Sequence, residues 1–252
     1  MRINQICHST FLVGAVVMSL VFWSCSDSPT EPSGGQLSMT SMYTANAFPA
    51  SVPKVSGSVP SAVAVDSVTI SRVRFVLRDI EFKSETDSVN LRTNPVVLEL
   101  NLLSNLQDVG VTNVPYGTFD EVEFDVHRID SSDLQGLSSS ETTQFAHFLA
   151  GERYSIIIDG TVYQSGGTGN IFQFRSKIDA QQKYQLTTPL VVSEAFPAAN
   201  VTLAVSSAGW FKNSTGVLLD PTDINNQSLI DENLKASIRV FKDDDRDGSE
   251  DQ

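Results

Sequence analysis

Apolar and polar residues alternate through the run 65–82, which is the period of a half-buried β-strand. The phase of this alternation slips twice, giving three groups: Val68 and Ile70; Val73, Phe75 and Leu77; Ile80 and Phe82. A slip of one residue turns a side chain to the other face of a sheet, unless the strand absorbs an extra residue. The run therefore predicts β-bulges within one strand, or two strands joined by a kink.

Shorter segments with the same period follow at 98–102, 122–126, 154–158, 172–174, 184–186 and 201–205. Turn signals separate some of them, because Pro115 and Gly117 fit a type I turn and the glycine-rich stretch 164–170 fits a hairpin loop. Short strands at this spacing predict an all-β fold, an antiparallel β-sandwich of the immunoglobulin or transthyretin kind, over residues 63–242. A further, earlier strand is expected near residues 36–43.

One short helix is expected to interrupt the strands. Ser138 and Glu141 form a capping-box pattern at its start, and Gly151 is placed to end it.

A second helix is expected at about 228–242, before an acidic tail at 243–252. Four apolar residues there fall on one helical stripe: Ile230, Leu234, Ile238 and Phe241. Ser228 is the expected cap of this C-terminal helix.

The first 24 residues have the parts of a bacterial signal peptide: basic Arg2, an apolar run at 11–23, and small Ser24 before Cys25. The apolar run is too short to span a membrane as a helix. We expect residues 1–24 to be removed and Cys25 to become the lipidated first residue. Cleavage by an ordinary signal peptidase near Ser24 is the alternative. Residues 25–62, rich in Ser, Thr, Pro and Gly, are expected to form a flexible tether.

The chain carries 17 basic and 30 acidic residues, a formal net charge of −13. This balance disfavours nucleic acid as a partner and suits a cation. Once Cys7 leaves with the signal peptide, Cys25 is the remaining cysteine, so no disulfide is expected and packing must supply the stability.

The acidic tail contains half of a calcium-binding loop. Asp243, Asp245 and Asp247 stand at loop positions 1, 3 and 5, and Gly248 stands at position 6, where the chain must turn sharply. The backbone of Ser249 and a water held by Asp251 are the expected ligands at positions 7 and 9. The candidate metal ligands are therefore Asp243, Asp245, Asp247, Ser249 and Asp251. Position 12, which supplies a bidentate Glu, lies beyond Gln252. The alternative is a solvated acidic tail.

Two further groups of residues are weaker candidates. The outward row Glu121, Glu123, Asp125 and His127 has metal-ligating side chains, although a solvated strand face is the commoner explanation. The aromatic side chains of Trp210, Tyr116 and Tyr163 are candidates for a ligand-binding surface, although core packing is commoner. The chain lacks the Gly-x-Ser-x-Gly, His-Glu-x-x-His and phosphate-loop signatures, so no catalytic residue is expected.

Three segments resemble uncharacterised bacterial envelope lipoproteins with a β-sandwich domain of unknown function, of the kind found in Bacteroidetes-like genomes. They are the run 68–82, the turn and strand at 114–124, and the ending from Trp210 through 219–222 to the acidic tail. The resemblance implies a sandwich fold, lipid anchoring and an acidic tail, and it implies no activity. The residue after the cysteine is Ser26. In the enterobacterial sorting scheme, a serine at this position, in place of an acidic residue, favours the outer membrane.

The sequence thus predicts a non-enzymatic, lipid-anchored envelope protein: a binding or structural β-sandwich module, with calcium as the cation that steadies it. The alternative is a carbohydrate-binding or carbohydrate-active surface lipoprotein that uses Trp210 and the loop tyrosines. The expected partners are the membrane, reached through the lipid on Cys25, and an envelope protein or glycan.

Overall fold

The computed structural model describes residues 34–47, 64–85, 87–103 and 105–252. The expected signal peptide at 1–24, the lipidation site Cys25, and residues 26–33 and 48–62 of the expected tether lie outside this part of the chain. The strands are β1 (Gly34–Thr44), β2 (Val65–Lys83), β3 (Ser88–Arg92), β4 (Val96–Glu99), β5 (Gln107–Pro115), β6 (Gly117–Val126), β7 (Ile156–Gln164), β8 (Asn170–Ser176), β9 (Ala180–Val192), β10 (Ala198–Ser206) and β11 (Ile238–Lys242).

Three short helices accompany the strands: α1 (Ser139–Gln144), α2 (Ala146–Leu149) and α3 (Gln227–Lys235). Two 3-10 turns, η1 (Ser131–Leu134) and η2 (Ile224–Asn226), precede α1 and α3. None of the helices in the described residues is both long and apolar enough to cross a membrane.

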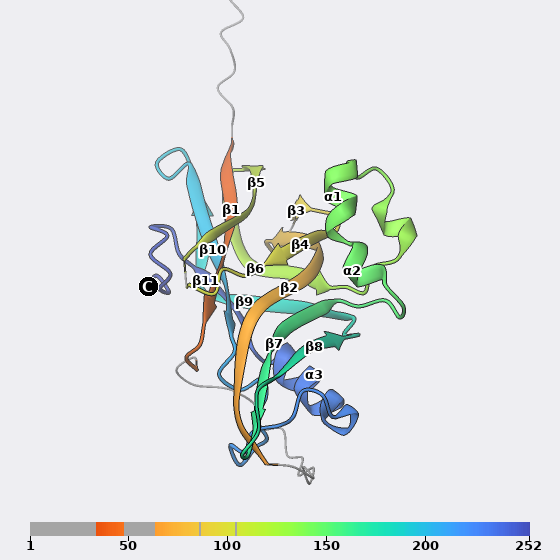
Figure 1. Ribbon diagram of the computed structural model, residues 1–252. Helices are drawn as coiled ribbons and strands as arrows, with labels where there is room; N and C mark the ends of the chain where they lie inside the picture. Colours follow the sequence, from red (N-terminus) through yellow and green to blue (C-terminus); the bar gives the residue numbers. More distant parts are fainter. Residues whose placement is uncertain (1–33, 48–63, 86, 104) are drawn as a thin grey trace, which may run out of the picture. The chain divides into compact units, whose positions relative to one another are not determined.

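The strands form two sheets, as the all-β prediction requires (Figure 1). The smaller sheet has the order β11-β10-β1-β5, and the larger has the order β8-β7-β2-β6-β9, with β3 and β4 also paired to β2. Neighbouring strands are antiparallel except for β1 and β10, which run parallel along nine residue pairs from Gln36 with Ala198 to Thr44 with Ser206.

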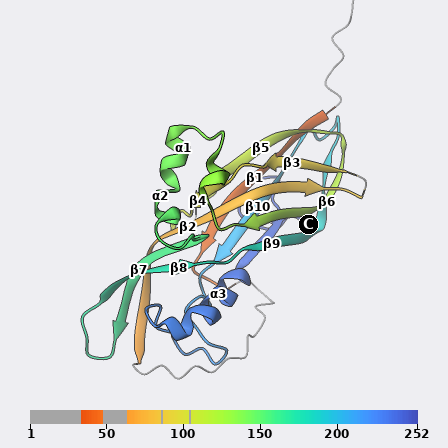
Figure 2. The same cartoon turned by 90° about the vertical axis from the view of Figure 1, so that its right-hand side faces the viewer.

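Strand β2 contains the bulges that the slipping alternation predicted. It is one continuous strand of 19 residues, and its register against β7 shifts between Ile70 and Arg72. A second shift, against β6, lies between Arg78 and Glu81, where Asp79 has a φ of 51°. The extra residues bend the strand, as Figure 2 shows. Its first part pairs with β7, and its last part pairs with β6.

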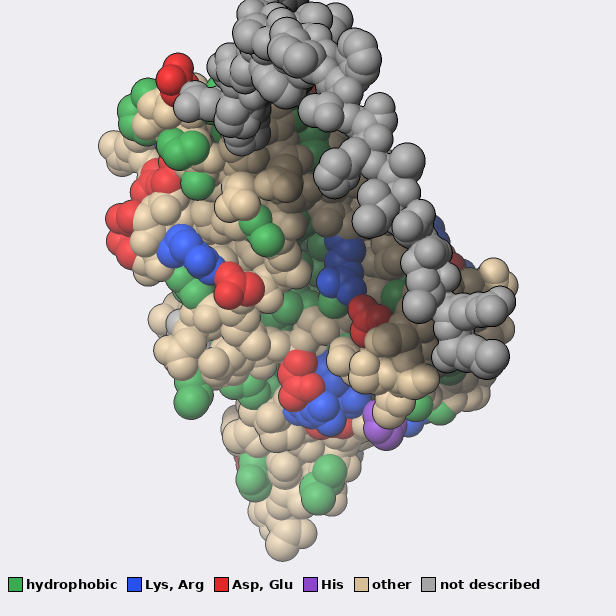
Figure 3. Space-filling view, turned by 90° about the horizontal axis from the view of Figure 1, so that it is seen from above, with side chains coloured by type: hydrophobic (Ala, Val, Ile, Leu, Met, Phe, Trp, Pro, Cys, Tyr) green, Lys and Arg blue, Asp and Glu red, His purple; other side chains and the backbone are tan. Residues whose placement is uncertain are grey.

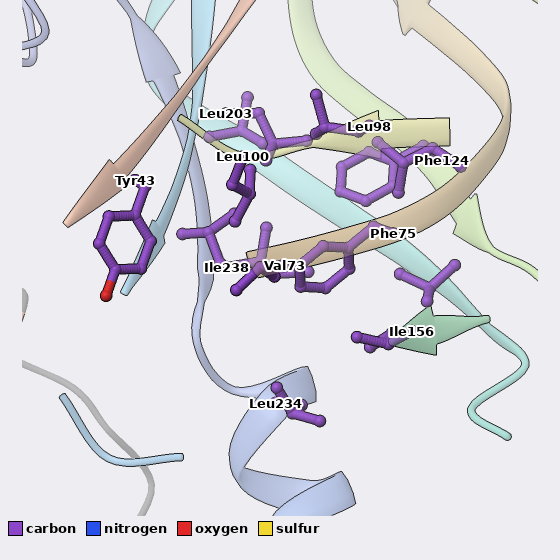
Figure 4. Packing of buried hydrophobic residues seen from close by; sticks show 14 of the residues in the cluster. Tyr43, Val73, Phe75, Leu98, Leu100, Phe124, Ile156, Leu203, Leu234 and Ile238 are labelled. Atoms are coloured by element: carbon purple, nitrogen blue, oxygen red, sulfur yellow. The ribbon is translucent and has the colours of Figure 1, made fainter. Parts of the chain in front are cut away.

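The main core lies between the inner faces of the two sheets. Phe75 and Phe124 from the larger sheet and Leu203 from the smaller one point into it, and Leu234 of α3 reaches the same cluster (Figure 4). Because alternate residues of a strand face opposite sides, the period-two pattern fills this core.

A second, smaller core lies on the outer face of the larger sheet. Val76 and Ile157 point outward there and pack against Phe145 and Phe148 of the helical segment. The Ser138 capping box forms as predicted, since the Ser138 side chain accepts from the Glu141 amide and Glu141 accepts from the Ser138 amide. The expected single helix is divided into α1 and α2 at Phe145.

The predicted C-terminal helix over 228–242 is wrong in its second half. Helix α3 ends at Lys235, and the hydroxyl of Ser237 bonds back to the carbonyl of Leu234. The following residues form β11, which pairs with β10. Ser228 does not cap the helix, because Asp223 caps the preceding turn η2 and the helix continues from it.

The expected boundary of the domain at residue 63 is also wrong. The strand expected near 36–43 exists as β1, but it lies between β10 and β5 and is therefore a central strand of the smaller sheet. In the described part of the chain, the sandwich begins with β1 at Gly34. At the other end the acidic tail packs back on the domain, since the Asp251 amide donates to the carbonyl of Lys242.

Candidate metal centre

The candidate loop begins where β11 ends, and its first aspartate is buried. Asp243 has no exposed surface, and its amide donates to the carbonyl of Asn200 on β10. The hydroxyl of Thr202, also on β10, donates to Oδ2 of Asp243 at 2.5 Å. The first carboxylate of the loop is therefore fixed by the sheet, and the expectation of a wholly solvated tail is wrong for this residue.

A buried polar ladder extends from Asp243 across two strands of the smaller sheet. The hydroxyls of Thr202 and Thr40 are 2.7 Å apart, which links β10 to β1. The side-chain amide of Asn200 donates to Thr40 Oγ1 at 3.1 Å and to the carbonyl oxygen of Asp243 at 2.9 Å, and its Oδ1 accepts from the Ser38 hydroxyl at 2.7 Å. Buried polar groups of this kind hold a single arrangement when all are hydrogen-bonded.

Three carboxylates converge in the loop. One oxygen each from Asp243, Asp245 and Asp247 lies within 4.8 Å of the others, and Asp245 and Asp247 are exposed. The loop's own amides position these groups, because Asp247 N–H donates to Asp243 Oδ1 (3.0 Å) and Gly248 N–H donates to Asp243 Oδ2 (3.2 Å). Oxygen ligands gathered in this way are what a hard divalent cation requires.

Gly248 occupies the position where the loop turns. Its φ of +83° lies in the left-handed region, which favours glycine. A Cβ at this position would lie 2.9 Å from Sδ of Met42 on β1, so the end of that side chain would have to shift. Both constraints agree with the glycine that the calcium-loop pattern places at position 6.

The negative charges of the loop act on one another. The Asp247 amide donates to Asp245 (3.2 Å), which alone would lower the pKa of that carboxyl. Desolvation and the charges of Asp247, Asp251 and Asp243 prevail, so the pKa of Asp245 is raised above its ordinary value. A cation between these oxygens would relieve the repulsion.

The remaining expected ligands lie nearby in different roles. Asp251 turns back to the loop, where its Oδ2 accepts from the amide of Asp244 at 2.6 Å. Ser249 donates its amide to Asp247 Oδ1 at 2.7 Å. Three of the five candidate ligands therefore form the cluster, and the other two fix the loop around it.

The aromatic residues do not form the predicted ligand-binding surface. Trp210 is fully buried, its ring lies 6.4 Å from that of Phe75, and its carbonyl accepts from Asn233 of α3. The expectation that Trp210 faces a ligand is therefore wrong. Tyr116 and Tyr163 are partly exposed, but Tyr116 lies in the β5–β6 turn and Tyr163 lies near the far end of β7 (Figure 1).

The row Glu121 to His127 is likewise not a metal site or a simple solvated face. Glu123 is only 4% exposed and pairs with Lys83 and with Lys183, its register partner on β9. Burial alone would raise the pKa of Glu123, but hydrogen bonds and charges from the two lysines hold it below the ordinary value. His127 lies between Asp133 (3.0 Å) and Asp179 (3.3 Å).

On the face drawn in Figure 3, acidic and basic side chains adjoin in a few places. Among the described residues, the group Asp243, Asp245 and Asp247 is the one set of three or more potential ligands close enough to share an ion. The sequence pattern identified this group, but it gave no sign that Thr202 and Asn200 hold its first member.

In comparisons with protein-family models, curated proteins and solved structures, none matches this chain.

Proposed function

We propose that this protein is a non-enzymatic β-sandwich module of the bacterial envelope, steadied by a calcium ion bound in the loop 243–251. The observation that carries the calcium proposal is the buried Asp243, which is fixed to β10 and lies within ligand distance of Asp245 and Asp247. A bound ion would tie the end of the chain to the sandwich through Thr202 and Asn200.

The proposed anchor rests on the sequence, with Cys25 as the lipidated residue and the outer membrane as its location. Eight residues, 26–33, lie between Cys25 and Gly34, where β1 begins. An anchored module of this kind binds or supports another envelope component, and its acidic surface keeps it soluble beside the membrane.

Calcium binding is tested by calorimetric titration of the full chain in detergent, with thermal melting followed in parallel. A loop with three carboxylates is expected to bind with a Kd of about 1 mM, and calcium at tenfold that concentration would add about 1.4 kcal/mol of stability. Asp245→Asn should weaken binding at least ~10-fold, because one charged ligand is lost. Asp66→Asn, on β2, removes the same charge elsewhere and should bind calcium as the parent does.

Equal calcium affinity in the parent and in Asp245→Asn would refute the site. The anchor has a separate test, in which Cys25→Ala is expressed in a bacterium and its membrane fraction is assayed. Release of the variant from the membrane is expected, and its retention there would overturn the anchor while leaving the calcium result intact.

A further inference from the structure

A groove of about 300 Å³ runs along the free edge of β8, on the side where α3 lies in Figures 1 and 2. Tyr154, Arg175 and Lys177 line one side of it, and Ile224 and Asp231 line the other. The amide of Gln227 joins the two sides, donating to the carbonyl of Arg175 at 3.3 Å and to the carboxylate of Asp231 at 3.2 Å.

Arg175 differs from every other arginine in the described residues. Each of the others has a carboxylate within ion-pair distance: Arg72 with Glu99, Arg74 with Asp159, Arg78 with Asp125, Arg92 with Glu141, Arg128 with Asp179, Arg153 with Asp130, Arg239 with Glu250, and Arg246 with Asp108. Arg175 has no such partner within the described part of the chain. In a protein with 30 acidic residues, an unpaired guanidinium in a groove points to an external anion.

The guanidinium of Arg175 is nevertheless held in one orientation. Its Nε donates to Oε1 of Gln173 at 2.6 Å, and its Cζ lies 5.1 Å from the centre of the Tyr154 ring. Gln173 is itself fixed, because its amide donates to Asp159 at 2.6 Å and Asp159 also accepts from the buried Arg74. Asp159 is thus already used, and Glu152, which also lines the groove, pairs with Lys177, so the terminal nitrogens of Arg175 remain available.

We propose that this groove binds a small organic carboxylate that also carries hydrogen-bond donors. Arg175 would receive the carboxylate through its planar fork of N–H groups, the geometry that favours paired hydrogen bonds to the two oxygens. The carboxylate of Asp231, on the opposite wall, would accept from a hydroxyl or amide N–H of the same ligand. Ile224, which is 78% exposed, offers apolar surface to the ligand skeleton.

Two sources present this chemistry, a sugar acid with its hydroxyls and the terminal carboxylate of a peptide with its amide. Saturation-transfer difference NMR on the full chain in deuterated detergent would distinguish them, using D-glucuronate and N-acetylalanine as probes. D-glucose and N-acetylalanine amide are the matched neutral compounds. Saturable binding of one acid, at least ~10-fold tighter than its neutral counterpart, is the expected result, and the acid that binds better names the source.

Three variants connect binding to the groove. Arg175→Gln should lose at least ~10-fold in affinity, and Arg175→Lys should lose part of it because the charge remains without the fork. Lys212→Gln removes an exposed cation outside the groove and should bind as the parent does. Melting temperatures check that each variant is folded. Binding of the acids no better than of the neutral compounds, or undiminished binding by folded Arg175→Gln, would overturn the proposal.

Discussion

The polar ladder under the candidate loop makes Asn200→Ala the most informative stability test. Asn200 is 3% exposed, and its side chain makes three hydrogen bonds, with Ser38, Thr40 and the carbonyl of Asp243. A hydrogen bond of this kind contributes about 1 kcal/mol net. Removing all three should therefore lower the free energy of unfolding by about 3 kcal/mol.

Urea unfolding, followed by tryptophan fluorescence, measures this loss, and Asn113→Ala is its control. Asn113 is exposed on β5 and makes one long hydrogen bond with Gln36, at 3.4 Å, so its loss should change stability by less than about 0.5 kcal/mol. A loss below about 1 kcal/mol in Asn200→Ala would refute the reasoning, because water would then replace the ladder without cost.

Trp210→Ala should lower the free energy of urea unfolding by about 3–5 kcal/mol, followed by circular dichroism because the variant lacks the tryptophan of the domain; the Trp210 ring is fully buried, whereas Phe196→Ala, at 67% exposed, should change little. Gly248→Ala should cost about 1–2 kcal/mol and weaken calcium binding, because its φ is +83°. Gly209→Ala is the control, because a Cβ there meets no atom within 4 Å. Equal melting temperatures of Gly248→Ala and Gly209→Ala would contradict the strain argument. Glu123 has a folded-state pKa below its ordinary 4.5, so its contribution to stability is present above pH 4.5 and is lost as the pH falls through the folded value. Unfolding measured from pH 7 to 3 should show a steeper acid loss in the parent than in Glu123→Gln, and identical profiles would contradict it.

The sequence predicted the strands well where packing and local pattern agree. Phe124 lies between polar neighbours and faces the core, as Phe75 also does, and the slips in β2 are bulges. The sequence failed where two periods fit the same residues. Ile238 fits a helical stripe with Leu234, but it also alternates with Val240, and pairing with β10 decides for the strand.

The candidate metal ligands were predictable because they are close in sequence. Asp243, Asp245 and Asp247 stand two residues apart, so a local turn is enough to bring them together. Their support was not predictable, since Asn200 and Thr202 are about 40 residues away in the chain and reach Asp243 through strand pairing. The groove at β8 likewise depends on Tyr154 and Asp231, which the fold alone makes neighbours.

The place of β1 determines how the sandwich would respond to tension. With an anchor at Cys25, drag on the domain would pull on Gly34 along the strand. Strand β1 is paired along its length with β10 on one side and with β5 on the other. Such a pull loads both rows of hydrogen bonds in shear, so many must break together rather than one after another. The strand that follows the tether would thus resist being pulled out of the sheet. The buried hydrogen bond between Asn200 and Thr40 would add to this resistance.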